Sequence, residues 1–278
     1  MLGRAILVLT LLTTSGTAAA KTPSPGRARV APRAGATKAS GAGTAATRTR
    51  SPRARASRPL ASELPDPATA PSYRYANLEK PACLAELAAR GIAFKPVDEA
   101  PGVLAPVRIP EGVGGVRYHT ALPPAERATS PYEVFDCRLV LALDDFSAIL
   151  RTRGIDEVVT FSAWRPPRKG WPKDKLAERH PGGLAIDIKT LRRSGARDPD
   201  AVLEVEDDYH GKIDAPSCGP DAFVAEDPSS RTVTLRELVC EAIAARLFTS
   251  VLTPNHDHAH RNHLHLDLAP GVNWRIVR

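Results

Sequence analysis

The sequence lacks any apolar run long enough to cross a bilayer. The run from Ala5 to Leu12 is far shorter than the roughly 20 residues that a transmembrane helix needs. It follows a single basic residue, Arg4, and precedes small residues that end in Ala18-Ala19-Ala20, which is the layout of a secretory signal peptide. No cysteine lies near this point, so a lipid anchor is not expected. We therefore predict that residues 1–20 are cleaved and that the mature chain is periplasmic or secreted.

Acidic and large apolar residues are scarce in the stretch that follows. Residues 21–62 contain ten Lys and Arg and no Asp or Glu. With so little apolar surface to bury, residues 21–75 are predicted to form a disordered basic arm rich in Pro, Ala and Arg. The arm carries +9 and the signal +1 of the formal net charge of +7, which leaves −3 for residues 76–278.

The charge of the arm favours anionic envelope polymers as partners, and the alternative is a plain spacer. Aromatic residues are not interleaved with the basic ones, as base stacking would require, so we expect no nucleic-acid partner.

The chain also lacks a Cys-x-x-Cys pair, which disfavours a zinc site made of four thiolates. Its four cysteines are Cys83, Cys137, Cys218 and Cys240. In an exported chain an even number of cysteines predicts two disulfides, and three pairings are possible. We favour Cys83–Cys137 and Cys218–Cys240, because each bond closes the shorter loop within its own half.

Residues 76–278 are a normal size for one domain. Apolar periodicity predicts helices at Pro81–Ala89 and from Cys137 to Leu150, and a β-branched run predicts a strand at Glu157–Ser162. Thr234-Leu-Arg-Glu237 has the pattern of a capping box, so a further helix is expected to begin there. Residues 190–231 are charged and rich in Pro and Gly, and we interpret them as an insertion or substrate-side loop.

Two motifs carry side chains suited to a metal. The first runs from His180 to Asp187 and reads His-Pro-Gly-Gly-Leu-Ala-Ile-Asp, and alternation along it turns Asp187 away from its apolar neighbours. The second, His263-Leu-His265-Leu-Asp267, places its histidines on one strand face and its leucines on the other. We interpret His180, Asp187 and His265 as ligands of Zn²⁺, with water in the fourth position. An open fourth position is typical of catalytic zinc, so a hydrolase is predicted.

The order His-x6-Asp followed by His-x-His resembles the zinc peptidases grouped around D-alanyl-D-alanine peptidases, murein endopeptidases and the Hedgehog signalling domain. Five segments more closely resemble the bacterial extensin-like C-terminal domain family, and this resemblance covers about residues 76–278. They are the Cys83 segment, Cys137-Arg-Leu, Ser162-Ala-Trp-Arg165-Pro, Gly-Gly-Leu-Ala-Ile-Asp187 and His263-Leu-His265-Leu-Asp. The resemblance implies an α+β fold in which helices flank a small antiparallel sheet with one zinc site.

The resemblance also implies roles for single residues. His180, Asp187 and His265 match the zinc ligands, and Arg165 matches an arginine that polarises the scissile carbonyl and stabilises the oxyanion. Export, disulfides and a basic arm suit an envelope substrate. We therefore expect a monomeric zinc peptidase that cuts peptidoglycan peptide stems or cross-links.

The general base is where the sequence departs from part of this group. One branch has a Glu three residues before the last ligand, but that position is Asn262 here. The murein endopeptidase branch has His-x-x-His-x-His, which His260, His263 and His265 match, so we expect His263 to act as the base with His260 assisting. Glu178 replaces a Ser that is common two residues before the first ligand.

These departures keep open a non-catalytic zinc-containing module that binds peptidoglycan. A structural wall protein whose arm is the functional part is a third alternative.

Overall fold

The computed structural model describes residues 66–195, 199–223 and 225–278. The predicted signal peptide, residues 1–20, lies outside the described residues. Residues 21–65 of the predicted arm also lie outside them. Within the described ranges, no helix is long and apolar enough to cross a membrane.

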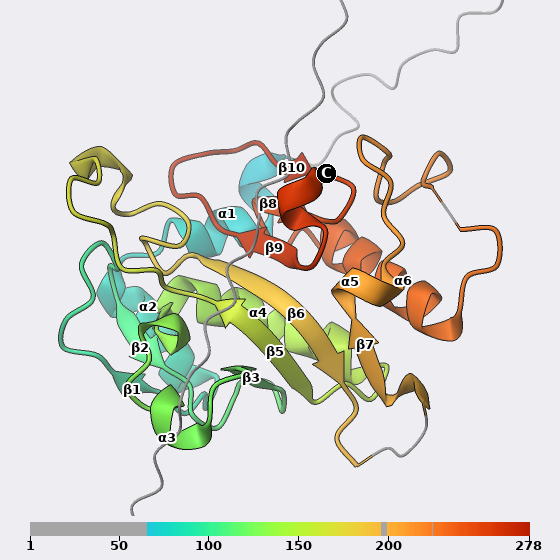
Figure 1. Cartoon of the computed structure of the whole chain (residues 1–278). Coiled ribbons are helices and arrows are strands. Elements are labelled where there is room, and N and C mark those ends of the chain that lie inside the picture. Colours follow the sequence, from blue (N-terminus) through green and yellow to red (C-terminus); the bar gives the residue numbers. More distant parts are fainter. Residues whose placement is uncertain (1–65, 196–198, 224) are drawn as a thin grey trace, which may run out of the picture. The chain divides into compact units, whose positions relative to one another are not determined.

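The described chain has an α+β fold built on a seven-stranded sheet of order β10-β8-β9-β6-β5-β3, with β7 also paired to β6 (Figure 1). Its strands are β3 (Arg117–Thr120), β5 (Glu157–Ser162), β6 (Ala185–Arg192), β7 (Val202–Glu204), β8 (Ser250–Leu252), β9 (Leu264–Asp267) and β10 (Ile276–Val277). A second sheet of three strands has the order β1-β2-β4 and comprises β1 (Lys95–Pro96), β2 (Pro106–Arg108) and β4 (Phe135–Asp136).

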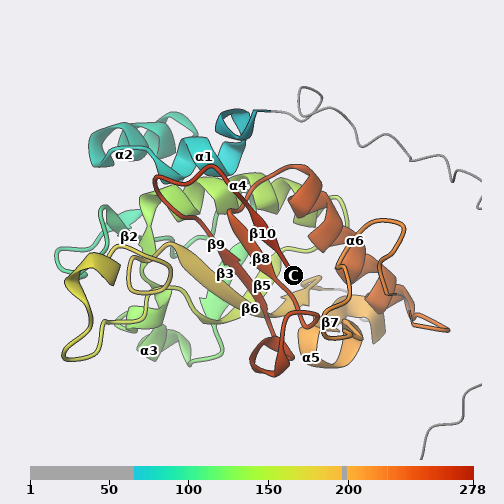
Figure 2. The same cartoon turned by 90° about the horizontal axis from the view of Figure 1, so that it is seen from above.

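The longer helices lie on one side of the seven-stranded sheet, as Figure 2 shows for α1, α2, α4 and α6. The helices are α1 (Pro71–Ala76), α2 (Lys80–Ala89), α3 (Pro124–Arg127), α4 (Cys137–Arg151), α5 (Val205–Asp208) and α6 (Ser230–Ala244). The core forms between this helical layer and the sheet, where α4 contributes Leu139, Leu143 and Phe146. The opposite face of the sheet is therefore free to carry polar side chains.

The sheet is mixed and larger than the small antiparallel sheet that we predicted. β3 pairs with β5 in parallel, and β10 pairs with β8 in parallel. The first pair is parallel because α4 lies between the two strands in the chain and returns it in the original direction. The second pair is parallel because the chain reverses twice, through β9, before β10 adds to the far edge of β8.

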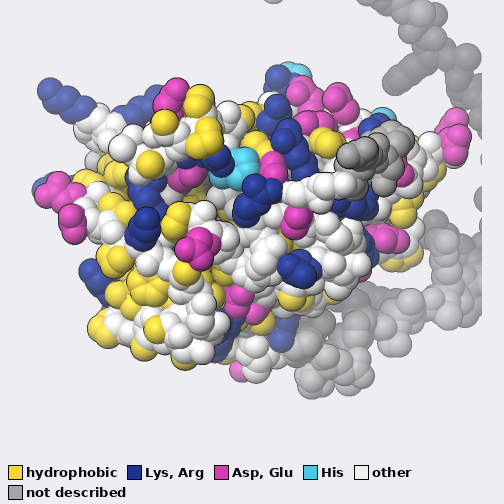
Figure 3. Space-filling view, turned by 90° about the horizontal axis from the view of Figure 1, so that it is seen from below, with side chains coloured by type: hydrophobic (Ala, Val, Ile, Leu, Met, Phe, Trp, Pro, Cys, Tyr) yellow, Lys and Arg dark blue, Asp and Glu magenta, His cyan; other side chains and the backbone are white. Residues whose placement is uncertain are grey.

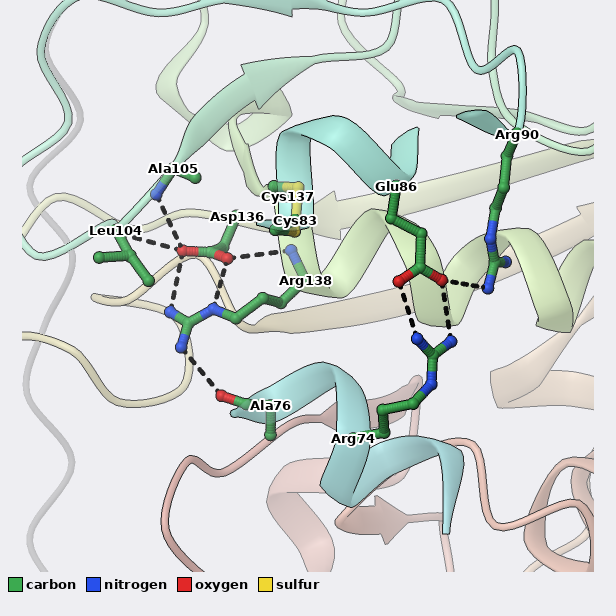
Figure 4. Close-up of a disulfide and its surroundings, with 10 residues drawn as sticks. All are labelled: Arg74, Ala76, Cys83, Glu86, Arg90, Leu104, Ala105, Asp136, Cys137 and Arg138. Carbon is green, nitrogen blue, oxygen red and sulfur yellow. Dashed lines mark hydrogen bonds and ion pairs between the residues drawn. A yellow bond between two sulfur atoms is a disulfide. The ribbon is translucent and has the colours of Figure 1, made fainter. Parts of the chain in front are cut away.

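The folded part begins earlier than the predicted boundary at residue 76. Pro71 starts α1, where its fixed φ and missing N–H are tolerated, and Tyr75 is buried in the core. Arg74 of α1 pairs with Glu86 of α2, which ties the two helices together, and Arg90 at the end of α2 pairs with the same carboxylate (Figure 4). The prediction of disorder up to residue 75 is thus wrong for residues 66–75, because tertiary packing outweighs their composition.

Both favoured disulfides, Cys83–Cys137 and Cys218–Cys240, are present, with Cα separations of 6.1 and 5.6 Å. The first joins α2 to the first residue of α4 (Figure 4). Beside it, the fully buried Asp136 caps α4 by accepting from the Arg138 backbone N–H and pairs with the Arg138 guanidinium at 2.8 Å. The start of α4 is therefore fixed covalently and ionically.

Two further predictions need correction. Helix α6 begins at Ser230 rather than at Thr234, because the Ser229 hydroxyl accepts from the Thr232 N–H and caps the helix one turn earlier. Residues 190–231 are more than an insertion, since β7 pairs with β6 and Tyr209 is fully buried in the core.

Candidate metal centre

The register of the sheet places Asp187 beside His265. In the antiparallel pair of β6 and β9 these two residues are directly opposite each other, and Ser162 of β5 is opposite Asp187 on its other side. Directly opposed residues hold their Cβ atoms about 4.5–5.5 Å apart. The neighbours Ile186 and Leu264 face the core, as the alternation predicted. A slip of one residue would turn the polar set into the core.

His180 reaches the same point from a tight turn that precedes β6. Arg179 and Gly183 both have positive φ, 43° and 64°, and the Leu184 N–H closes the turn on the Arg179 carbonyl at 2.8 Å. The His180 carbonyl accepts from the Arg165 N–H at 3.1 Å, which fastens the turn to the segment after β5. The Gly-Gly pair of the motif is therefore needed for the backbone path that delivers His180.

The three predicted ligands converge on one carboxylate oxygen. Asp187 Oδ1 lies 3.2 Å from His180 Nε2 and 2.9 Å from His265 Nδ1. One donor atom from each residue lies within 4.8 Å of the others, and all three side chains are buried. Two imidazole nitrogens and one carboxylate are a donor set that zinc prefers.

The remaining ring nitrogens test whether these residues fit a metal. His180 Nδ1 donates to the Ala163 carbonyl at 2.6 Å, which leaves Nε2 to face the centre. His265 Nε2 lies 3.0 Å from Asp267 Oδ2, which leaves Nδ1 to face it. Metal-binding histidines nearly always donate their second nitrogen in this way, to a carbonyl or a carboxylate. The arrangement therefore fits a bound zinc ion.

The local charges keep the Asp187 carboxylate ionised. Burial by itself would raise the pKa of Asp187, but hydrogen bonds from His180 and His265 outweigh it and hold that pKa well below its usual range. Burial would lower the pKa of His265, yet its hydrogen bonds to Asp187 and Asp267 raise the pKa to about 9. Asp187 is thus a buried anion, which would attract a metal cation.

Arg165 lies at the mouth of the centre. Its Nη2 contacts Asp187 Oδ2, the oxygen that the histidines leave free, and its Nε donates to Ser162 Oγ at 2.8 Å. About half of its side chain is exposed, so the guanidinium is accessible to a substrate.

The two predicted proton-transfer histidines flank the ligands. His263 Nε2 lies 3.5 Å from Asp187 Oδ1, and burial lowers the pKa of His263 to about 4. Its Nδ1 is 2.9 Å from the side-chain oxygen of Asn262, so the residue at the missing Glu position orients His263. The His260 ring is 5.1 Å from the His263 ring and 6.0 Å from the His265 ring, centroid to centroid. The structure thus brings all the predicted site residues together.

Several supporting residues escaped the sequence reasoning. The Ala163 carbonyl holds His180, whereas Glu178 pairs with Lys175 at 3.0 Å and has no hydrogen bond to His180. Asp267 holds His265, and its alternation with His265 along β9 was a signal for this role. No local pattern marks a backbone carbonyl as a partner.

A groove of about 540 Å³ adjoins the centre. Its lining includes the cations Arg165, Arg168, Lys175 and Arg179, the acid Glu178, and Trp171 and His180. Figure 3 shows a face of the molecule on which histidine lies among lysine and arginine side chains. The groove therefore offers a cationic and partly aromatic surface next to His180.

Comparison with known proteins gives a family match in the C-terminal part. A family model described as extensin-like protein C-terminus matches residues 219–278, the part that holds α6, β8, β9 and His263-Leu-His265. No curated protein and no solved structure matches the chain. The match supports the resemblance to the extensin-like family in the C-terminal part, and it does not extend to the motif that contains His180 and Asp187.

Proposed function

We propose that this protein is an exported zinc-dependent peptidase that acts on peptidoglycan peptide stems or cross-links. The observation that carries the proposal is the convergence of His180, Asp187 and His265, in which each histidine has its second ring nitrogen held by an oxygen. Two of the three residues, Asp187 and His265, stand on paired strands, which hold side chains more precisely than loops do.

A zinc ion at this centre would lower the pKa of a water molecule and polarise a substrate carbonyl. Arg165 is placed to stabilise the negative charge that develops on that carbonyl oxygen. His263 is placed to take a proton from the attacking water, because Asn262 holds its Nδ1 and leaves Nε2 facing the centre. The His260 ring lies tilted beside the His263 ring, and His260 would be the assisting group.

The groove supports the proposed class of substrate. Four cations against one acid favour an anionic ligand, and the partly exposed Trp171 offers a surface on which a sugar or a peptide plane can stack. Peptidoglycan stems carry free carboxylates and are attached to sugars. Two disulfides suit an oxidising compartment, where such a substrate is found.

A second function stays open because of Asn262. This residue cannot accept a proton, and Arg165 lies against Asp187. A module that binds zinc and peptidoglycan without cutting it would have the same groove and the same ligands.

The test is the zinc content of the purified mature chain together with its release of soluble muropeptides from peptidoglycan. His265→Gln is the ligand variant, because an amide retains a donor for Asp267, and His258→Ala is the control at an exposed histidine. We expect about one tightly held zinc ion and cleavage in the wild type and the control, and neither in His265→Gln. Zinc without cleavage would favour the binding module, and absence of tight zinc would refute both.

A further inference from the structure

A second group of metal-binding side chains lies beside the first centre. His256, Asp257 and His260 place one donor atom each within 4.8 Å of one another. They come from the loop after β8 and from the 3-10 turn His258–His260. We propose that these three residues form a second site for a divalent transition metal, with zinc as the ion that fits best.

The donor atoms resemble those of the first centre in kind, but here each histidine lies nearest a different oxygen of the carboxylate. His256 Nε2 lies 3.5 Å from Asp257 Oδ2, and His260 Nδ1 lies 2.8 Å from Asp257 Oδ1. The two rings are 5.0 Å apart, centroid to centroid. Two imidazoles and one carboxylate therefore lie close enough together to act as ligands of one cation.

The carboxylate at this second site is held in place before any ligand binds. Asp257 is the N-cap of the 3-10 turn, and its Oδ1 accepts from the backbone N–H groups of Ala259 and His260 at 2.8 and 3.1 Å. Oδ2 is not used by the cap, so it remains directed at His256. A rigid carboxylate reduces the entropy that metal binding would otherwise cost.

The chemistry of the donors selects the ion. Imidazole nitrogen suits zinc and other late transition metals, whereas calcium and magnesium require oxygen ligands. The side chains of His256 and Asp257 are 34% and 47% exposed, so water can complete the coordination. Because they are less buried than the ligands of the first centre, we expect a weaker site whose metal exchanges with the solution.

His260 connects the two sites. Its ring contacts the rings of both His256 and His265. A metal at the second site would therefore engage the histidine that the proposed function uses as an assisting group. Metal binding at the second site does not depend on the proposed function. Only the effect of that metal on turnover rests on it.

The experiment is a zinc titration of the metal-stripped chain, measured by calorimetry. Metal analysis after dialysis then counts the ions that stay bound. His256→Ala removes a ligand, and Asp257→Asn lowers the charge but keeps a capping side chain. The matched control is His258→Ala, at an exposed histidine in the same turn that is outside the group. Far-ultraviolet circular dichroism checks that each variant is folded.

We expect two zinc ions in the wild type and in His258→Ala, one tight and one weaker. His256→Ala and Asp257→Asn should weaken the second site by at least about tenfold and leave the tight one unchanged. His265→Gln should lose the tight ion and keep the weaker one, which separates this proposal from the function proposed for the first centre. A single zinc ion in the wild type, or equal weak binding in His256→Ala and His258→Ala, overturns it.

Discussion

Replacing His265 by Ala should destabilise the metal-free protein as well as remove one of the proposed zinc ligands. Asp267 is 1% exposed, and its Oδ2 is 3.0 Å from His265 Nε2. Its Oδ1 has no hydrogen-bond partner, and the Arg179 guanidinium is 3.7 Å from Oδ2 on a largely exposed side chain. Without His265, a buried carboxylate loses the group that best compensates its charge.

The cost of stranding one member of a buried charged pair is about 3–5 kcal/mol. In a domain of roughly 200 residues this lowers the melting temperature by about 6–20 °C. Urea unfolding with a chelator present, followed by tryptophan fluorescence, measures the change without any contribution from zinc. The double variant His265→Ala/Asp267→Asn no longer carries the Asp267 charge, and Asp187 keeps His180 and Arg165, so it should recover about 1–3 kcal/mol of the loss.

The comparison of the single and double variants decides whether the reasoning holds. Equal unfolding midpoints for His265→Ala and His265→Ala/Asp267→Asn would show that Asp267 does not depend on His265. Asp267→Asn by itself completes the double-mutant cycle. It should change the free energy of unfolding less than His265→Ala does. A larger loss from Asp267→Asn would contradict the assigned roles of the two residues.

Three other outcomes are expected. Arg165→Lys should lower the rate of muropeptide release by about 100-fold and leave the zinc content unchanged, because Lys cannot reproduce the two parallel donors of a guanidinium. A loss of zinc would contradict the proposed role of Arg165. Excess zinc should inhibit release by the wild type but not by His256→Ala, as a rate series against zinc concentration would show. Gly183→Ala should lower the free energy of unfolding by about 1–3 kcal/mol, because φ of Gly183 is +64° and a Cβ would lie 2.9 Å from the Asp136 backbone nitrogen. An unchanged urea midpoint would refute this prediction.

The proximity of His180, Asp187 and His265 could be predicted from the sequence, because strand alternation and a tight turn are local features. Alternation put Asp187 and His265 on the polar faces of their strands, and a Gly-Gly turn brought His180 to the same edge. Strand β10 could not be predicted, because two residues carry no period and their pairing with β8 depends on the rest of the sheet. Helix α1 was missed for a related reason, since the burial of Tyr75 stabilises it and its composition does not.

The first disulfide also has a consequence for the order in which the protein matures. Cys137 directly follows Asp136, whose backbone N–H donates to the Gly183 carbonyl at 2.9 Å. Gly183 in turn lies in the turn between His180 and Asp187. The disulfide to Cys83 therefore restrains the backbone that contacts the turn carrying His180. In reducing surroundings this restraint is missing, so we expect thiol oxidation to precede zinc capture and the newly made chain to stay inert until it reaches an oxidising compartment.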